Sequence, residues 1–352
     1  MSAKLFGAAV ALLFLAAPPA FSDNVVWILL DGVRRQEWLE GVDATILAAR
    51  HKAGIENPDA LHDLYWRETP EARRRALMPF FWTVLAPRGV VLRSTITNPH
   101  RTSYPGYAEL LTGRAVPEIE GNYSVQIPWE TSLEIARRSL GLEVRDVAAV
   151  TSWNHFRFIA AHQPGAVFVD YGEAVPAELA TPEMARWREL QTKMLTPWDS
   201  IRHNAITVQL ALEYLKTYQP RLLLLALSET DEWAHDRRYD RTVQSLRGVD
   251  DSLREIWTTL QSIEVYRGRT SLVLSTDHGR GLTLEDWTSH GSTVPGSEQA
   301  WIAVVGPHTP DVGSMPGIVR NDQVAATVLT LLGIDYRVLG PETGPPIRAA
   351  IR

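Results

Sequence analysis

The sequence predicts an α/β protein whose mainly parallel sheet is covered by helices on both faces. Short apolar runs rich in Val, Ile and Leu recur along the chain, as is typical of buried parallel strands. They occupy residues 25–30, 90–96, 144–150, 166–169, 221–227, 271–276 and 301–305. Longer stretches with helical apolar spacing separate them, at residues 129–140, 182–218, 239–260 and 322–332. Strands that alternate with helices favour a sheet between two helical layers.

Two segments carry no clear strand and interrupt this alternation. Residues 57–87 are rich in Arg, Trp and Pro, and residues 172–200 have a similar composition. We expect both to be excursions over the edge of the sheet at which ligands bind, with a separate small domain as the alternative. Residues 23–352 as a whole are expected to form one domain.

The first 22 residues have the features of an export signal. Lys4 supplies positive charge, residues 5–17 form an apolar run, and Ala20-Phe21-Ser22 offers small residues for a signal peptidase. The run is shorter than the ~20 apolar residues that span a bilayer. A buried N-terminal helix is the alternative. Cleavage after Ser22 would leave a mature chain without a membrane span, in the periplasm or secreted.

Composition narrows the chemistry that the chain can support. It has no cysteine, so a metal would have to be held by His, Asp and Glu. The net charge of −6 argues against a nucleic-acid partner, because phosphate backbones recruit Lys and Arg.

Three predicted strands run into an aspartate. Asp31 follows the first strand, Asp231 comes shortly after the strand at 221–227, and Asp277 follows the strand at 271–276. Ligands bind at the carboxyl ends of parallel strands, and neighbouring strand ends lie about 5 Å apart. One such aspartate is usually a turn residue or a helix cap, whereas three at one edge favour a shared site.

Three histidines extend this set. His235 lies four residues after Asp231, so both face one way on a helical turn. His278 adjoins Asp277, and His290 follows in a Gly-flanked loop. Taken singly, each histidine is more often an ordinary surface or core residue. Together, three carboxylates and three imidazoles suffice for two divalent cations of the zinc or manganese kind, whereas calcium prefers oxygen ligands. The expected ligands are Asp31, Asp231, His235, Asp277, His278 and His290.

A candidate nucleophile lies in the segment from Thr102 to Gly106. Proline is favoured at the first position of a helix, so we expect a helix to begin at Pro105, with Ser103 just before it. Backbone N–H groups and the helix dipole favour an anion there, and a metal can activate a serine hydroxyl. From these residues alone, a serine that only caps the helix is the alternative.

In chain order, these segments resemble the motifs of the alkaline phosphatase superfamily, especially its type I phosphodiesterase and nucleotide pyrophosphatase branch. The similar segments are VVWILLDG at 25–32, TSYPGYAELLTGR at 102–114, EIEGNY at 118–123, SETDEWAH at 228–235, STDHG at 275–279, SHGS at 289–292 and NDQVAATVLTLLGI from 321. The resemblance covers most of the chain after the export signal. It implies a catalytic domain with the three-layer sandwich fold of that superfamily.

The resemblance also implies a reaction and roles for the residues. Two zinc ions about 4 Å apart would clamp the attacking and leaving oxygens of a small-molecule phosphoric ester. Ser103 would become phosphorylated, and the intermediate would then be hydrolysed. Asn122 and the Ser103 N–H would stabilise charge on the equatorial oxygens. The ligands fall into two groups, Asp31, Asp277 and His278 with Ser103 for one zinc, and Asp231, His235 and His290 for the other.

Two features leave the substrate open. The usual nucleophile of this branch is threonine, and Ser103 takes its place. Some monoesterases of the superfamily grip a terminal phosphate with a Lys and Arg pair, and Arg157 falls roughly where that pair would lie. A solvated or structural role is the alternative for Arg157, so the choice between monoester and diester stays open.

Three other assignments compete with a phosphoric ester hydrolase. A sulfatase shares the fold, but its modified Cys or Ser is followed by Pro-x-Arg, and here Gly106 and Tyr107 follow Pro105. A phosphomutase usually carries a large inserted domain, for which this chain has little room. An exported binding protein that keeps the metals would have no need of a nucleophile.

Overall fold

The computed structural model describes residues 24–173 and 179–352. The predicted export signal at residues 1–22 lies outside these ranges. In the described part of the chain, one eight-stranded sheet has the order β4-β3-β5-β1-β6-β7-β2-β8. Its strands are β1 Asn24–Leu30, β2 Gly89–Thr95, β3 Val147–Thr151, β4 Phe168–Asp170, β5 Leu222–Leu227, β6 Thr270–Thr276, β7 Gln299–Val305 and β8 Gly313–Arg320. β7 pairs antiparallel with β6 and β2, and the other pairs are parallel, so the predicted mainly parallel sheet is confirmed.

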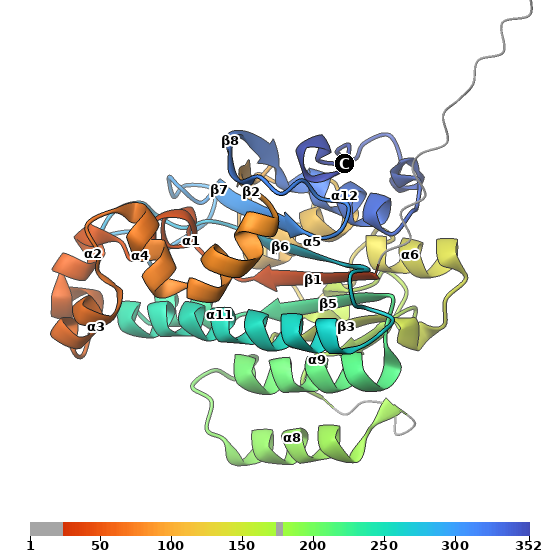
Figure 1. Ribbon diagram of the computed structural model, residues 1–352, viewed down its shortest axis with the longest axis horizontal. Helices are drawn as coiled ribbons and strands as arrows, with labels where there is room; N and C mark the ends of the chain where they lie inside the picture. The colour runs from red at the N-terminus through yellow and green to blue at the C-terminus, as the bar shows by residue number, and fades with distance from the viewer. Residues whose placement is uncertain (1–23, 174–178) are drawn as a thin grey trace, which may run out of the picture.

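Helices cover both faces of the sheet, as predicted (Figure 1). In β1, Val26, Ile28 and Leu30 enter one core with α1, α9 and α11, whereas alternate residues enter a second core with α5, α6 and α12. The helices are α1 Arg35–Glu40, α2 Ala44–Ala48, α3 Pro58–Tyr65, α4 Pro70–Leu77, α5 Ser103–Thr112, α6 Ser132–Leu140, α7 Phe156–Ile159, α8 Pro182–Lys193, α9 Asn204–Tyr218, α10 Glu229–His235, α11 Tyr239–Ser262 and α12 Val324–Leu331. Shorter helical turns are π-helical at Phe81–Leu85 and 3₁₀ at Arg50–Ala53, Ala86–Arg88, Val144–Asp146, Asn321–Gln323, Tyr336–Leu339 and Arg348–Ala350.

Two elements differ from the sequence prediction. β8 is missing from it, because this edge strand has the sequence GSMPGIVR and is largely exposed, so it lacks an apolar run. The single helix expected over 182–218 is two helices, α8 and α9. Pro197 lies between them; proline cannot donate a backbone hydrogen bond, and it disfavours helical geometry at the residue before it.

The two segments predicted to be excursions pack against different helices. Residues 57–87 form α3, α4 and the π-helical turn, and α4 packs against α1 and α11 near the carboxyl ends of the strands (Figure 1). In the second segment, α8 packs against α9. The loop after α8 reaches α10, because the centroid of the Trp198 ring lies 4.6 Å from that of Trp233 on this helix.

Three strand ends meet at the centre of the sheet. β1 pairs with β5 on one side and β6 on the other, so that Leu30 lies beside both Leu227 and Thr276. The residues that follow these strands therefore share one edge. This register brings the segments that carry Asp31, Asp231 and Asp277 together.

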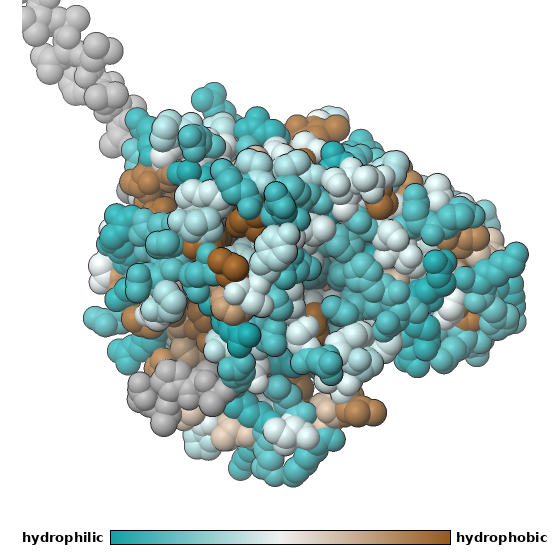
Figure 2. Space-filling model, turned by 180° about the vertical axis from the view of Figure 1, so that it is seen from behind, coloured by the Kyte–Doolittle hydropathy of each residue, from teal (hydrophilic) through white to brown (hydrophobic). Residues whose placement is uncertain are grey.

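On the face seen from behind, the hydrophobic residues of the described part of the chain lie in separate groups among hydrophilic ones (Figure 2). None of the helices in the described residues is long and apolar enough to cross a membrane.

Candidate metal centre and nucleophile

The three strand-end aspartates converge on one histidine. Asp31, Asp231 and Asp277 are all buried, and so is His278. The Nε2 atom of His278 lies 3.4 Å from Asp31 Oδ1, 3.4 Å from Asp277 Oδ2 and 3.8 Å from Asp231 Oδ1. The edge predicted from the strand ends is therefore a compact cluster of buried acidic side chains around one histidine.

The six predicted ligands form two groups that adjoin each other. Within each group, the ligand atoms all lie within 4.8 Å of one another. His235 Nε2 lies 3.0 Å from Asp231 Oδ2 and 3.0 Å from His290 Nε2. The His290 ring stacks on that of His278 at a centroid distance of 3.9 Å. The groups are Asp31, Asp277 and His278, and Asp231, His235 and His290, the same division that the family resemblance implies.

Backbone carbonyls set the tautomers of two histidines. His278 Nδ1 lies 3.0 Å from the Gly279 carbonyl oxygen, and His290 Nδ1 lies 3.1 Å from that of Arg101. A carbonyl only accepts hydrogen bonds, so each Nδ1 carries a proton, and in the neutral imidazole Nε2 is then the atom with the lone pair. Both Nε2 atoms face the other ligands. Metal-binding histidines are oriented in this way by a second hydrogen bond.

One buried carboxylate oxygen, Oδ2 of Asp277, is left to bind a cation. Asp277 Oδ1 accepts a hydrogen bond from the Gly32 N–H at 3.0 Å. Asp277 Oδ2 is buried and has no hydrogen-bond donor. Leaving a charged oxygen without a partner in the interior is costly, and a divalent cation would supply one. The donor set of carboxylates and neutral imidazoles therefore fits a metal of the zinc kind.

The charges of the site are strongly perturbed. Burial raises the pKa of Asp31 and of Asp277, and the neighbouring aspartates add to the shift. Burial also acts to raise the pKa of Asp231, but Arg280 and His235 hold it well below its usual value. Burial, with the neighbouring His278, lowers the pKa of His290 to about 2, so this imidazole is neutral, as a metal ligand must be.

Ser103 occupies the first position of α5, which begins two residues earlier than the predicted start at Pro105. The prediction was wrong because proline is accommodated within the first turn as well as at its first position, where its missing N–H has no partner to lose. The Ser103 hydroxyl lies 3.3 Å from His278 Nε2 and 3.5 Å from Asp31 Oδ1. The candidate nucleophile therefore faces the first ligand group.

Asn122 lies next to the nucleophile. Its Oδ1 accepts a hydrogen bond from the backbone N–H of Tyr104 at 2.9 Å, and the Tyr104 hydroxyl donates to the Val125 carbonyl at 2.6 Å. These bonds hold the loop that carries Asn122 against the start of α5. A contact between Asn122 and a phosphoryl oxygen stays a prediction.

The contacts of Arg157 include none of the six predicted ligands. It belongs to α7, forms an ion pair with Glu173 at 3.1 Å and places its guanidinium over the Phe158 ring at 4.7 Å. These contacts match the structural alternative. A role in binding phosphate stays a prediction.

Sequence reasoning missed three residues that shape the site. Arg280 is buried and contacts Asp231. Gly32 has a φ of +57°, and a Cβ there would fall 2.1 Å from Asp231 Oδ1. A Cβ on Gly106 would fall 2.3 Å from the carbonyl oxygen of Asp277. Glycine and arginine beside a motif are too common to indicate such contacts before the chain is folded.

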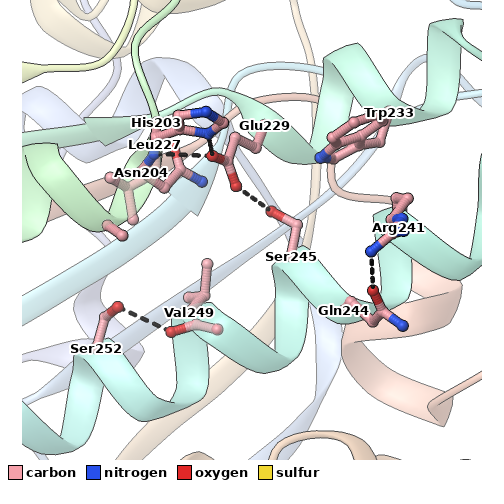
Figure 3. Close-up of a pocket in the computed structure, with 12 residues that line it drawn as sticks. His203, Asn204, Leu227, Glu229, Trp233, Arg241, Gln244, Ser245, Val249 and Ser252 are labelled. Atoms are coloured by element: carbon pink, nitrogen blue, oxygen red, sulfur yellow. Dashed lines mark hydrogen bonds and ion pairs between the residues drawn. The ribbon is translucent and has the colours of Figure 1, made fainter. Parts of the chain in front are cut away.

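A separate cavity of about 290 Å³ lies between α10 and α11 (Figure 3). Glu229 reaches from α10 to His203, whose Nδ1 is 2.9 Å away, and towards Ser245 on α11. None of the six predicted ligands lines this cavity. The polar groups of Figure 3 thus join α10 to His203 and to α11, and they are separate from the six predicted ligands.

Solved structures share this architecture, although no protein-family model and no curated protein match the sequence. The phosphonate monoester hydrolase of Agrobacterium radiobacter is 13% identical, with a TM-score of 0.53 over 88% of this chain and 74% of that chain. A putative sulfatase from Bacteroides thetaiotaomicron is 14% identical, with a TM-score of 0.53 over 89% and 71%. A protein in the alkaline phosphatase superfamily from Vibrio parahaemolyticus is 12% identical, with a TM-score of 0.51 over 93% and 71%. The chain therefore has the fold of the alkaline phosphatase superfamily.

Proposed function

We propose that the chain is a metal-dependent phosphoric ester hydrolase in which Ser103 is the nucleophile. One observation carries the proposal: the Ser103 hydroxyl, at the start of a helix, lies against two adjoining groups of Asp and His side chains. A serine that only caps a helix would not need such neighbours. The same fold in a phosphonate monoester hydrolase and in a putative sulfatase supports the reaction class.

Each group of the site has a defined task in this reaction. Two divalent cations, held by the six ligands, would neutralise the phosphoryl oxygens and clamp the attacking and leaving oxygens. Ser103 would give up its hydroxyl proton and attack phosphorus while the P–O bond to the leaving alcohol breaks. Water would then break the Ser103–phosphorus bond, which releases the phosphate product and restores the hydroxyl. At the start of α5, the backbone N–H of Ser103 would stabilise the negative charge, because the Tyr104 N–H already donates to Asn122 and Pro105 has none. Asn122, whose Oδ1 accepts from the Tyr104 N–H, would use its side-chain N–H to hold an equatorial oxygen.

A sulfuric ester is the second candidate substrate, because a putative sulfatase shares the fold. The composition of the site favours phosphate. Three of its six ligands are imidazoles, and residue 107, where the sulfatase motif has arginine, is a buried tyrosine. We also propose that the chain acts outside the cytoplasm, on the basis of the export signal.

The test replaces Ser103 by alanine and measures both hydrolysis and metal content. We expect Ser103→Ala to keep its metals and to lose at least about 10³-fold in kcat for p-nitrophenyl phosphate or bis-p-nitrophenyl phosphate, because covalent catalysis is removed. Mass spectrometry after rapid quenching should find phosphoserine at residue 103 in the wild type alone. Ser132→Ala is the matched control, since Ser132 is also the buried first residue of a helix, α6.

Three outcomes separate the alternatives. Wild-type turnover in Ser103→Ala would refute the nucleophile. Hydrolysis of p-nitrophenyl sulfate in preference to both phosphate esters would establish the sulfatase alternative. Absence of turnover on all three, with metals bound, would favour a binding protein.

A further inference from the structure

Arg280, just after β6, joins the two segments that carry the second ligand group to the end of that strand, which carries Asp277 and His278. It follows His278 by two residues, and only 1% of it is exposed. Its Nη2 donates to the backbone carbonyl of Asp231 at 2.9 Å and to Asp231 Oδ1. Its Nη1 donates to the carbonyl of Thr288, two residues before His290. One rigid guanidinium thus ties the end of β6, the start of α10 and the loop of His290 together.

We propose that Arg280 is a positioning residue for the metal held by Asp231, His235 and His290. The proposal rests on the metal centre of the proposed function. Asp231 Oδ1 is taken by the guanidinium, whereas Oδ2 lies 3.0 Å from His235 Nε2. Arg280 therefore turns Asp231 so that a single oxygen faces the two histidines. The aspartate becomes a one-oxygen ligand of fixed direction.

The contact between Arg280 and Asp231 depends on the absence of a side chain at Gly32. Gly32 adopts a φ of +57°, and a Cβ at this position would fall 2.9 Å from Arg280 Nε as well as 2.1 Å from Asp231 Oδ1. A side chain at residue 32 would therefore collide with the Arg280–Asp231 pair. The left-handed glycine directly after Asp31 thus leaves the space that the pair occupies beside the first ligand group.

Electrostatics argues that the role of Arg280 is orientation. A buried guanidinium beside a metal site repels the incoming cations, so its charge by itself weakens metal binding. A buried arginine also brings several donors in a planar fork, which fixes direction better than a lysine can. Three of these hydrogen bonds go to segments that bear ligands. The orienting bonds are thus what Arg280 contributes to the site.

The test measures metal binding and does not depend on turnover. The full-length protein is stripped with a chelator, and zinc is added back in a calorimeter. Cobalt absorption spectra report the ligand geometry of each site. Arg280→Met removes the donors at similar volume, and Arg280→Lys keeps the charge. We expect Arg280→Met to weaken one of two zinc-binding events by about 10–100-fold and to change the cobalt spectrum, since outer hydrogen bonds have effects of this size. Arg280→Lys should recover part of the loss.

Arg202→Met is the matched control. Arg202 is also buried and donates to Asp170 at 2.8 Å and to Thr207 at 2.9 Å, but none of the ligands is its partner. We expect this variant to lower Tm and to leave both zinc affinities unchanged. A merely structural role for Arg280 would give the same pattern as Arg202.

The outcomes are distinct. Unchanged or tighter zinc binding in Arg280→Met would overturn the proposal, because the guanidinium would then act only as a competing cation. If Arg280→Met does not fold, Arg280→Lys decides: wild-type affinity at both sites contradicts the role, and weaker binding at one site supports it. A wild-type protein that binds two zinc ions but hydrolyses no ester would refute the proposed function and leave this inference standing. A wild-type protein that binds no zinc would overturn both.

Discussion

Gly106→Ala is a one-carbon test of how closely α5 must approach the metal centre. A Cβ at residue 106 would lie 2.3 Å from the carbonyl oxygen of Asp277 and 3.0 Å from its Cβ. Both obstacles belong to a residue fixed at the end of β6, so the helix has to move. An ordinary carbon–oxygen contact is about 3.4 Å long, so α5 would have to move about 1 Å away from Asp277.

This movement would be felt at the nucleophile. Ser103 lies one turn before Gly106 on the same helix, and its hydroxyl faces His278, the residue after Asp277. A misplacement of about 1 Å costs about 10²-fold in rate, so we expect kcat/KM to fall by about that factor. Stability should change less, because about 1–3 kcal/mol of overpacking is partly offset by about 1 kcal/mol of helix propensity.

The assay compares kcat/KM for p-nitrophenyl phosphate, zinc content and Tm of wild type, Gly106→Ala and a control. Gly248→Ala is that control, because Gly248 also lies within a helix, α11, and a Cβ there meets nothing within 4 Å. It should keep its activity and gain about 0.5–1 kcal/mol. Wild-type kcat/KM in Gly106→Ala would refute the close approach of α5 as a condition for catalysis.

Three further predictions concern the metals and a buried acid. Asp231→Ala or His290→Ala should bind one zinc instead of two and lose most activity, because only one of the reacting oxygens stays clamped; metal analysis that still finds two would contradict the ligand grouping. Chelation should lower Tm, since three buried aspartates lose their counter-ions, and added zinc should restore it. At a zinc concentration one hundred times Kd, the gain in unfolding free energy should be about 2.7 kcal/mol. A Tm that changes with neither treatment would count against the metal centre. Burial raises the pKa of Glu109 from 4.5 to about 7, although hydrogen bonds from the 97–98 loop act to lower it. Over this pH range the folded state therefore holds a proton that the unfolded state releases, so the contribution of Glu109 to stability should decline between about pH 4.5 and pH 7. Urea unfolding of the metal-free wild type and of Glu109→Gln should give a difference in unfolding free energy that varies over this range. A constant difference would contradict the prediction.

The local sequence was sufficient to predict most of the sheet. In a continuous apolar run such as the one at 25–30, side chains on both faces of the strand are apolar and must both be buried. Such a run therefore predicts an interior parallel strand. Seven of the eight strands in the described residues were anticipated in this way, and β8 was not. An edge strand buries little, so its residues carry no apolar pattern.

The sequence also placed the six ligand candidates at one edge, because the carboxyl ends of parallel strands share it. Asp31 and Asp277 directly follow β1 and β6, and strand polarity alone brings them to the same side. The pairing of Asp231 with His235 followed from helical spacing. The division into two groups came from the family resemblance, and the structure arranges the side chains in the same way.

Tertiary structure alone decided the directions of these groups. The tautomers of His278 and His290 depend on carbonyls of Gly279 and Arg101, and the orientation of Asp231 depends on Arg280. Strand and helix periods fix which edge or face a residue occupies. They do not fix which distant polar atom completes its hydrogen bonds, because that depends on how loops far apart in the chain pack together.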